Sequence, residues 1–124
     1  MKKILLDANF LIDLIKYKID VDGMEELVGG DCRLVVLKPV LTELRKISGG
    51  KSKDSRFAKI ALMVIKEKGF DIVETEEKKA DEAIVRMADE DTAVATNDIE
   101  LKKRLRALGV RVIHLRAKKH LAVS

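Results

Sequence analysis

A short apolar run that ends in a carboxylate constrains the start of this chain more than any other feature. Residues 4–6 are Ile-Leu-Leu, a continuous apolar segment of the kind expected for a buried parallel strand. Apolar residues then recur at helical spacing, at Phe10, Leu11, Leu14 and Ile15. Asp7 therefore lies where a strand ends and a helix begins, which is where open parallel sheets bind ligands. On this stretch alone, a cation or phosphate site and a simple helix cap at Asp7 or Asn9 are equally good interpretations.

Length and composition predict one domain over residues 1–124, because 124 residues with 47% hydrophobic content can bury a substantial core. The single cysteine, Cys32, excludes an internal disulfide, and with two histidines it argues against a zinc site. No apolar run reaches membrane-spanning length, and Asp7 interrupts the N-terminal apolar stretch too early for a signal peptide. We therefore expect a cytoplasmic protein without a membrane partner.

The charge pattern permits a nucleic-acid partner. Charged residues make up 37% of the chain, and the net charge is +4. Aromatic residues make up only 3%, so platforms for base stacking are scarce. Candidate RNA-binding residues lie around a Gly-Gly break, at Lys46, Lys51, Lys53 and Arg56. A solvated charged surface explains this stretch at least as well, and RNA following the basic tail over residues 116–120 is the alternative path.

Buried-type strands alternate with helices along the whole chain. Strands are expected near residues 4–6, 34–37, 70–73, 92–96 and 110–113, with the third at an edge. Helices are expected near residues 10–15, 23–28, 39–48, 52–68, 76–88 and 98–108. This alternation predicts an α/β protein, folded as a three-layer α/β/α sandwich around a mainly parallel sheet.

Asp81 is the most informative carboxylate. It shares a helix face with Ile84, Val85 and Ala88, which is the side that a helix presents to the core. A carboxylate on such a face destabilises the fold unless it is paired or bound to a metal. The alternative is that Asp81 lies at the edge of the stripe and reaches water, or pairs with Lys78 or Arg86.

Two further acids have similar positions. Asp98 follows a strand as Asp7 does, although Asn97 with Glu100 also resembles a capping box. Glu43 lies in the first turns of its helix, where any acid suits the helix dipole. Because the carboxyl ends of parallel strands meet at one edge, Asp7, Glu43, Asp81 and Asp98 are expected to converge on one acidic pocket.

Such a pocket repels itself at neutral pH unless a cation neutralises it. Its ligands would all be oxygen atoms, which select hard ions such as Mg²⁺ or Mn²⁺. Carboxylates that hold one or two such ions in a basic protein suggest phosphodiester chemistry, in which the ions activate water and stabilise the attacking and leaving oxygens.

Four segments together resemble the PIN-domain nucleases. They are residues 5–12 (LLDANFLI), 39–44 (PVLTEL), 80–84 (ADEAI) and 94–101 (VATNDIEL). The resemblance implies a Rossmann-like sheet with acids at its carboxyl edge and metal-dependent endoribonuclease activity. By position, the family's acidic quartet matches Asp7, Glu43, Asp81 and Asp98, with Mg²⁺ or Mn²⁺ as the implied cofactor. Supporting polar positions match Asn9 and Thr96, and Asn97 is a further candidate.

The resemblance implies RNA as the partner, in RNA processing or in a toxin–antitoxin pair of the VapC type. An antitoxin, a ribosome-biogenesis protein or a second copy of the chain would be a further partner. Two alternatives remain open. One is a non-catalytic RNA-binding scaffold, which the intact acids disfavour. The other is a phosphatase with Asp7 as nucleophile, which requires a second acid where Asn9 stands.

Overall fold

The computed structural model describes residues 2–124, and its centre is a six-stranded sheet. The strands are β1 (Lys2–Leu6), β2 (Cys32–Leu37), β3 (Asp71–Val73), β4 (Thr92–Ala95), β5 (Arg111–Arg116) and β6 (His120–Val123). Their order in the sheet is β3-β2-β1-β4-β5-β6, and each neighbouring pair is parallel except β5 and β6. The predicted mainly parallel sheet, with its third strand at an edge, is therefore confirmed.

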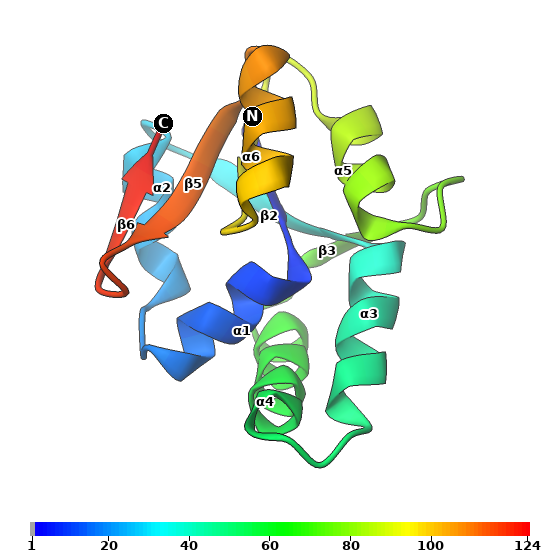
Figure 1. Cartoon of the computed structure of the whole chain (residues 1–124). Coiled ribbons are helices and arrows are strands. Elements are labelled where there is room, and N and C mark those ends of the chain that lie inside the picture. The colour runs from blue at the N-terminus through cyan, green and yellow to red at the C-terminus, as the bar shows by residue number, and fades with distance from the viewer. Residues whose placement is uncertain (1) are drawn as a thin grey trace.

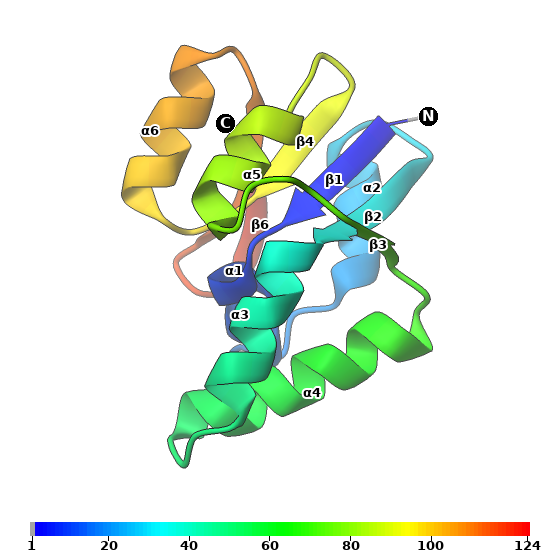
Figure 2. The same ribbon diagram turned by 90° about the vertical axis from the view of Figure 1, so that its right-hand side faces the viewer.

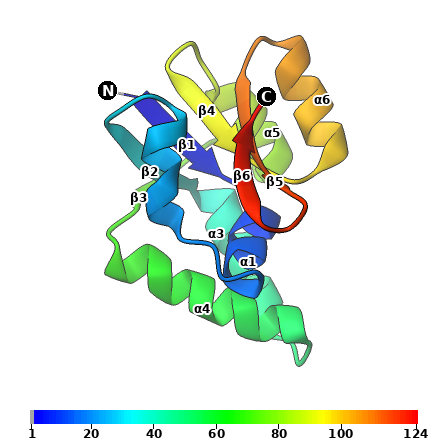
Figure 3. The same ribbon diagram turned by 90° about the vertical axis from the view of Figure 1, so that its left-hand side faces the viewer.

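Helices lie on both sides of this sheet (Figures 1 and 2). They are α1 (Ala8–Lys16), the 3-10 turn η1 (Val21–Gly23), α2 (Met24–Leu27), α3 (Lys38–Ser48), α4 (Lys53–Glu67), α5 (Ala80–Met87) and α6 (Ile99–Ala107). Figure 3 shows α2 on one side of the sheet and α5 and α6 on the other, while α1 and α4 pack together beyond the carboxyl end of β1. The predicted α/β class with helices on both faces is confirmed.

The strand order explains where a site can form. The chain moves from β1 to β2 and β3 on one side, and then returns to place β4 on the other side of β1. The carboxyl ends of β1 and β4 are therefore neighbours at the point where the strand order reverses, which is the usual ligand position in open parallel sheets. Leu6 pairs with Ala95 there, and both residues are buried.

The buried apolar residues of β1 hold the carboxyl end of this strand in place. Ile4, Leu5 and Leu6 are each at most 2% exposed, because β1 is central and has helices on both faces. Phe10 on α1 and Leu44 on α3 are also completely buried and belong to the same core. The first residues after β1 are consequently held by packing on every side. Within residues 2–124, no helix has the length and apolar character needed to cross a membrane.

The helix predicted over residues 76–88 begins later, at Ala80. Residues 74–79 are polar or charged, so they offer no apolar stripe whose burial would stabilise a helix. The hydroxyl of Thr75 instead donates to the carbonyl of Glu77 in a turn. The prediction was right about the helix and wrong about its first turn.

The basic tail was not predicted to be a strand, yet residues 120–123 form β6 against β5. The turn that joins them has Ala117 and Lys118 at its centre, both with positive φ. Such turns are usually recognised by Asn or Gly, and neither is present here. The partly buried side chains of Leu121 and Val123 pack against the core and hold the strand in place.

Candidate active site

Asp7 is the buried centre of the candidate site. It follows β1 and caps α1, with Oδ1 accepting from the backbone N–H of Ala8 at 2.9 Å. Its Oδ2 accepts from the hydroxyl of Thr96 at 2.8 Å. Asp7 is only 4% exposed. The helix-cap interpretation is therefore correct for one carboxylate oxygen, and the second oxygen faces the end of β4.

Thr96 joins the ends of two strands. Its side chain is completely buried, and its hydroxyl donates to Asp7 while accepting from the backbone N–H of Asp98 at 3.1 Å. Its own backbone N–H donates to the carbonyl of Ile113 on β5 at 3.0 Å. The Thr96 hydroxyl thus donates one hydrogen bond to the Asp7 carboxylate and accepts another from the backbone of Asp98. The role as a supporting polar residue stays a prediction, but the contacts required for it are present.

Asp98 is the N-cap of α6, where Oδ1 accepts from the backbone N–H of Leu101 at 2.9 Å. The capping box predicted with Asn97 as the cap is therefore wrong by one residue. The side chain of Asn97 makes two other hydrogen bonds, donating to Oδ2 of Asp13 at 2.8 Å and accepting from the N–H of Leu115 at 2.8 Å. These two bonds connect the 96–98 turn to α1 and β5, and they fix the direction in which Asp98 leaves the sheet.

Glu43 and Asp81 line the same groove from two different helices. Glu43 lies in the second turn of α3 and is partly buried, and Asp81 is the second residue of α5. The groove has a volume of about 510 Å³, and its lining includes both acids. Figure 2 shows the start of α5 beside the start of α3. The structure thus brings these two predicted residues to one open groove, Glu43 from α3 and Asp81 from α5.

Asp81 is exposed, so the expectation that its helix face buries it is wrong. Ile84, three residues later, is completely buried as predicted. The first turn of α5 extends past the packed region toward the groove, which leaves Asp81 in water. No ion pair between residues 2–124 includes Asp81, so the alternative that it reaches solvent is the correct one.

Negative charge accumulates around Asp7. Burial raises the pKa of Asp7 from 3.8 to about 6, the hydrogen bond from Thr96 opposes that rise, and the charges of Glu43 and Asp81 add to it. Burial also raises the pKa of Glu43, and the charge of Asp81 raises it further. Asp7, Glu43 and Asp81 therefore lie within electrostatic reach of one another, whereas Asp98 is connected to Asp7 through the hydroxyl of Thr96.

The oxygen donors suit a hard divalent cation. Asp7 is a buried carboxylate whose hydrogen bonds come from an amide and a hydroxyl, so a cation would find its negative charge uncompensated. In the described part of the chain, however, no three acidic, histidine or cysteine side chains are close enough to hold one ion together. The arrangement fits an ion held by one or two carboxylates with water completing its shell, which is the usual mode for Mg²⁺.

The remaining predicted residues are distributed unevenly. Asn9 is exposed in the first turn of α1. Lys46 lines the groove beside Glu43. The other RNA-binding candidates follow α3. Lys51 lies in the connection to α4, and Lys53 and Arg56 lie in the first turn of α4. Of these four residues, only Lys46 lines the groove that contains Glu43 and Asp81, and RNA binding by the other three stays a prediction.

Three relevant residues were not predicted. Lys78 and Lys79 line the groove opposite Lys46, and the available signal was a Lys-Lys pair immediately before the Ala80-Asp81 motif. Asp13 holds the amide of Asn97. No sequence signal identified Asp13, because its partner is 84 positions away along the chain.

Comparison with known proteins identifies the family. A family model described as a PIN like domain matches residues 4–118. The chain belongs to the PIN-like domain family. The resemblance that four short motifs indicated is thereby confirmed, and the matched range of this PIN-like chain includes all four acids, from Asp7 to Asp98.

Two further comparisons support the assignment over nearly the full length of the chain. Ribonuclease VapC4 of Methanocaldococcus jannaschii is 35% identical over 129 residues, covering 99% of this chain and 97% of the relative. The solved structure of the PIN domain endonuclease Utp24 superimposes with a TM-score of 0.81 at 27% identity, covering 98% of this PIN-like chain and 90% of Utp24.

A more distant solved structure shares the fold alone. The structure of VapBC2 from Rickettsia felis, bound to a DNA fragment from its promoter, matches with a TM-score of 0.59 at 14% identity. The match covers 92% of this chain and 99% of the other. The sheet and helix arrangement is thus shared with a protein of very different sequence.

Proposed function

We propose that this PIN-like chain is a metal-dependent endoribonuclease that hydrolyses RNA phosphodiester bonds, with Asp7, Glu43, Asp81 and Asp98 as its catalytic carboxylates. One observation carries the proposal. The Asp7 carboxylate is nearly buried, its burial raises its pKa, and the charges of Glu43 and Asp81 raise that pKa further. A buried charge held beside other like charges lowers stability unless a cation binds there, so the arrangement is explained by a bound ion.

Each carboxylate has a distinct proposed role. Asp7 and Asp98 would be the principal ligands, because they end adjacent strands and are linked through Thr96. Glu43 and Asp81, which line the groove, would complete the site through water, because no three acids lie close enough among residues 2–124 to hold one ion directly. Mg²⁺ or Mn²⁺ bound here supplies Lewis-acid activation of water and neutralises charge that develops on the phosphate.

The chain's own groups prepare the site for an anionic substrate. The hydroxyl of Thr96 fixes the orientation of the Asp7 carboxylate. Lys46, Lys78 and Lys79 line the groove that contains Glu43 and Asp81. No ion pair between residues 2–124 includes any of these lysines, so their charge remains available for phosphates.

Two alternatives are weaker. A non-catalytic RNA scaffold would have no reason to retain an acid in the costly position of Asp7. A phosphatase that forms an aspartyl-phosphate on Asp7 requires a second acid two residues later, where the exposed Asn9 stands. Detection of phosphate covalently attached to Asp7 would favour the phosphatase.

The biological setting is a separate proposal. Ribonuclease VapC4 is the 35%-identical relative, which supports RNA as the substrate and an antitoxin as a protein partner. The likeness to the PIN domain endonuclease Utp24 supports nuclease activity, and RNA processing with a ribosome-biogenesis protein as partner is the alternative setting that we propose. A homodimer and a cytoplasmic location are proposed for either setting.

The test is RNA cleavage with Mn²⁺, Mg²⁺ or excess EDTA, by wild type and by Asp7→Asn. Cleavage should require a divalent ion, and Asp7→Asn should abolish it while preserving the folded state. Glu100→Gln is the matched control, because Glu100 is an exposed acid two residues from Asp98 that does not line the groove. Undiminished cleavage by wild type in excess EDTA would contradict the proposed mechanism.

A further inference from the structure

A second basic surface forms where the end of α1 meets the turn between β5 and β6. Tyr17 is the C-cap of α1. The ammonium group of Lys16 lies over the Tyr17 ring, 5.4 Å from its centroid, and that of Lys118 lies 5.8 Å from it. Figure 3 shows this turn beside α1. We call this region the Tyr17 surface, and its members are Lys16, Tyr17, Lys18, Arg116, Lys118 and Lys119.

The backbone of this turn is strained. Ala117 and Lys118, its two central residues, have φ values of 55° and 57°, and the N–H of Lys119 closes the turn on the carbonyl of Arg116 at 3.1 Å. Residues with a side chain destabilise this conformation, so such turns usually contain Asn or Gly. Here a lysine occupies the strained position and its ammonium group reaches Tyr17. Strain of this kind is typical of functional segments.

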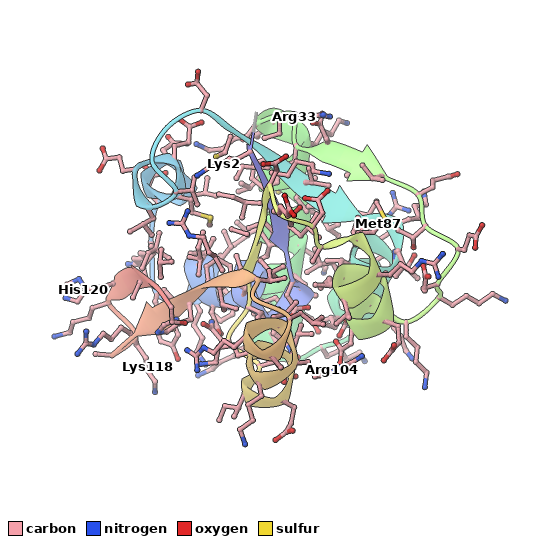
Figure 4. The ribbon with its side chains drawn as sticks, turned by 90° about the horizontal axis from the view of Figure 1, so that it is seen from above. Lys2, Arg33, Met87, Arg104, Lys118 and His120 are labelled. Carbon is pink, nitrogen blue, oxygen red and sulfur yellow. The ribbon has the colours of Figure 1, made fainter. Side chains whose placement is uncertain are left out.

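The charges of this surface are uncompensated. The ion pairs found between residues 2–124 include none of its five cations. Figure 4 shows Lys118 and His120 projecting outward at the end of the β5–β6 hairpin. A cluster of free cations around an aromatic ring matches single-stranded nucleic acid, in which phosphates bind the cations and an unstacked base covers the ring.

The Tyr17 surface and the candidate active site are close enough for one RNA molecule to contact both. Helix α1 begins directly after Asp7 and has nine residues, so its end is roughly 14 Å from its start. On the other side, the N–H of Leu115 donates to the side chain of Asn97 in the turn that precedes Asp98. Both elements of the surface are therefore anchored at the carboxyl edge of the sheet, where the acids lie.

We propose that the Tyr17 surface binds a single-stranded part of the RNA substrate, with one nucleobase stacked on Tyr17 and the neighbouring phosphates held by Lys16, Lys118 and Lys119. The incoming base takes the place of one lysine over the ring, and that ammonium group moves to a phosphate. The proposal rests on the proposed ribonuclease function and adds to it a requirement for an unpaired segment in the substrate.

Tyr17 itself provides the measurement. The chain has one tyrosine and no tryptophan, so its intrinsic tyrosine fluorescence reports on Tyr17 alone. The titration uses the Asp7→Asn protein in EDTA, so that RNA stays intact, and the probe is a short oligouridylate. Saturable quenching should accompany binding, because a stacked base quenches the ring. Inorganic polyphosphate should bind the cations and produce much less quenching.

Substitutions separate stacking from charge. In the same Asp7→Asn background, Tyr17→Leu should weaken oligouridylate binding about fivefold or more, as expected for one lost stacked base. Tyr17→Phe keeps the ring and should preserve affinity in an anisotropy assay with labelled RNA. Lys118→Gln with Lys119→Gln should reduce the salt dependence of binding. Lys2→Gln with Lys66→Gln is the matched control, because these exposed lysines lie at the start of β1 and near the end of α4, and it should leave the salt dependence unchanged.

The outcomes are distinct from those that test the nuclease. Oligouridylate that binds without quenching, or binds Tyr17→Leu as tightly as the parent protein, would overturn the proposal even if wild type cleaves RNA with Mn²⁺. Absence of any oligouridylate binding would also overturn it. Quenching by poly-glutamate and not by oligouridylate would indicate an acidic peptide as the partner and reject RNA.

Discussion

Thr96 donates its hydroxyl hydrogen to Oδ2 of Asp7 at 2.8 Å, although the two residues are 89 positions apart in the sequence. The same hydroxyl accepts from the backbone N–H of Asp98. A single side chain thus connects the ends of β1 and β4, the two central strands between which the strand order reverses. The separation of the two proposed principal ligands depends on this threonine.

Thr96→Val should therefore destabilise the metal-free protein. Valine has nearly the shape of threonine but leaves the Asp7 oxygen and the Asp98 N–H without this partner, which should lower the free energy of unfolding by about 1–3 kcal/mol. Thr96→Ser keeps the hydroxyl and should lose less stability and less activity. Chemical unfolding in EDTA, with cleavage measured in parallel, checks both variants. Equal stability of the valine variant and wild type would show that the hydroxyl has no structural role.

The raised pKa of Asp7 predicts how the metal-free protein depends on pH. In the folded protein the pKa of Asp7 is about 6, against 3.8 for an ordinary aspartate. The folded state therefore binds the proton more tightly, and the free energy of unfolding should fall as the pH rises from about 4 to about 6, and then level off. The whole difference corresponds to about 3 kcal/mol at most.

Asp7→Asn removes this titration. In EDTA the variant should be more stable than wild type above pH 6, and its advantage should shrink as the pH falls toward 4, because the wild-type carboxyl then becomes neutral as well. Unfolding curves of both proteins across this pH range provide the measurement. A difference in stability that stays constant with pH would show that Asp7 is ionised as easily in the folded state as in the unfolded chain.

Much of the fold followed from local patterns. Continuous apolar runs located β1, β2 and β4, and Gly69, with its φ of 65°, ends α4 at the predicted left-handed position. The elements that local patterns failed to predict depend on contacts between distant parts of the chain. The turn before strand β6 lacks the Gly or Asn that usually predicts a hairpin. The strand forms because it pairs with β5 and packs Leu121 and Val123 against the core.

The candidate site shows the same division. Strand ends predicted that Asp7 and Asp98 lie near one another, because parallel strands bring their carboxyl ends together. The bonds that orient them come from Thr96, Asn97 and Asp13 across long sequence separations, which a pattern within one helix or strand cannot reveal. Asp81 failed as a burial prediction for a related reason. Helical periodicity predicts on which side of a helix a residue lies. It does not predict how far along the helix that side is covered by the rest of the protein.

The groove lysines should bind substrate more strongly than the lysines of the α3–α4 connection. Lys46→Gln with Lys79→Gln removes two cations from the groove that contains Glu43 and Asp81. Binding of single-stranded RNA to the Asp7→Asn protein should weaken, and the slope of log affinity against log salt should fall by about 0.7 per lysine. A salt slope unchanged from that of the parent protein would show that phosphates do not enter the groove.

The control for this experiment is Lys51→Gln with Lys53→Gln, which makes the same change in net charge. These lysines lie at or just before the start of α4, beyond the end of α3 that is farther from Asp81. Their removal should reduce binding only through the overall charge of the protein. If both double variants weaken binding equally, the groove has no special role in RNA contact.

Asp98 tests whether a helix cap also serves as a metal ligand. Its Oδ1 accepts from the N–H of Leu101, a bond that asparagine can make equally well. Asp98→Asn should therefore leave the metal-free fold nearly unchanged, while it removes a negative charge that a hard cation needs. Metal affinity and cleavage should fall together. Asp98→Ala should additionally lower the free energy of unfolding by about 1 kcal/mol, because it removes the cap.

The measurements are thermal unfolding with and without Mn²⁺ and the cleavage rate, for wild type, Asp98→Asn and Asp98→Ala, with Glu100→Gln as the charge-matched control on the same helix turn. A ligand role predicts that Mn²⁺ raises the unfolding temperature of wild type and Glu100→Gln, and raises that of Asp98→Asn much less. A cap role alone predicts equal stabilisation by Mn²⁺ in all of them. Near-wild-type cleavage by Asp98→Asn would remove Asp98 from the proposed ligands, and the proposed link through Thr96 would then serve only to hold Asp7.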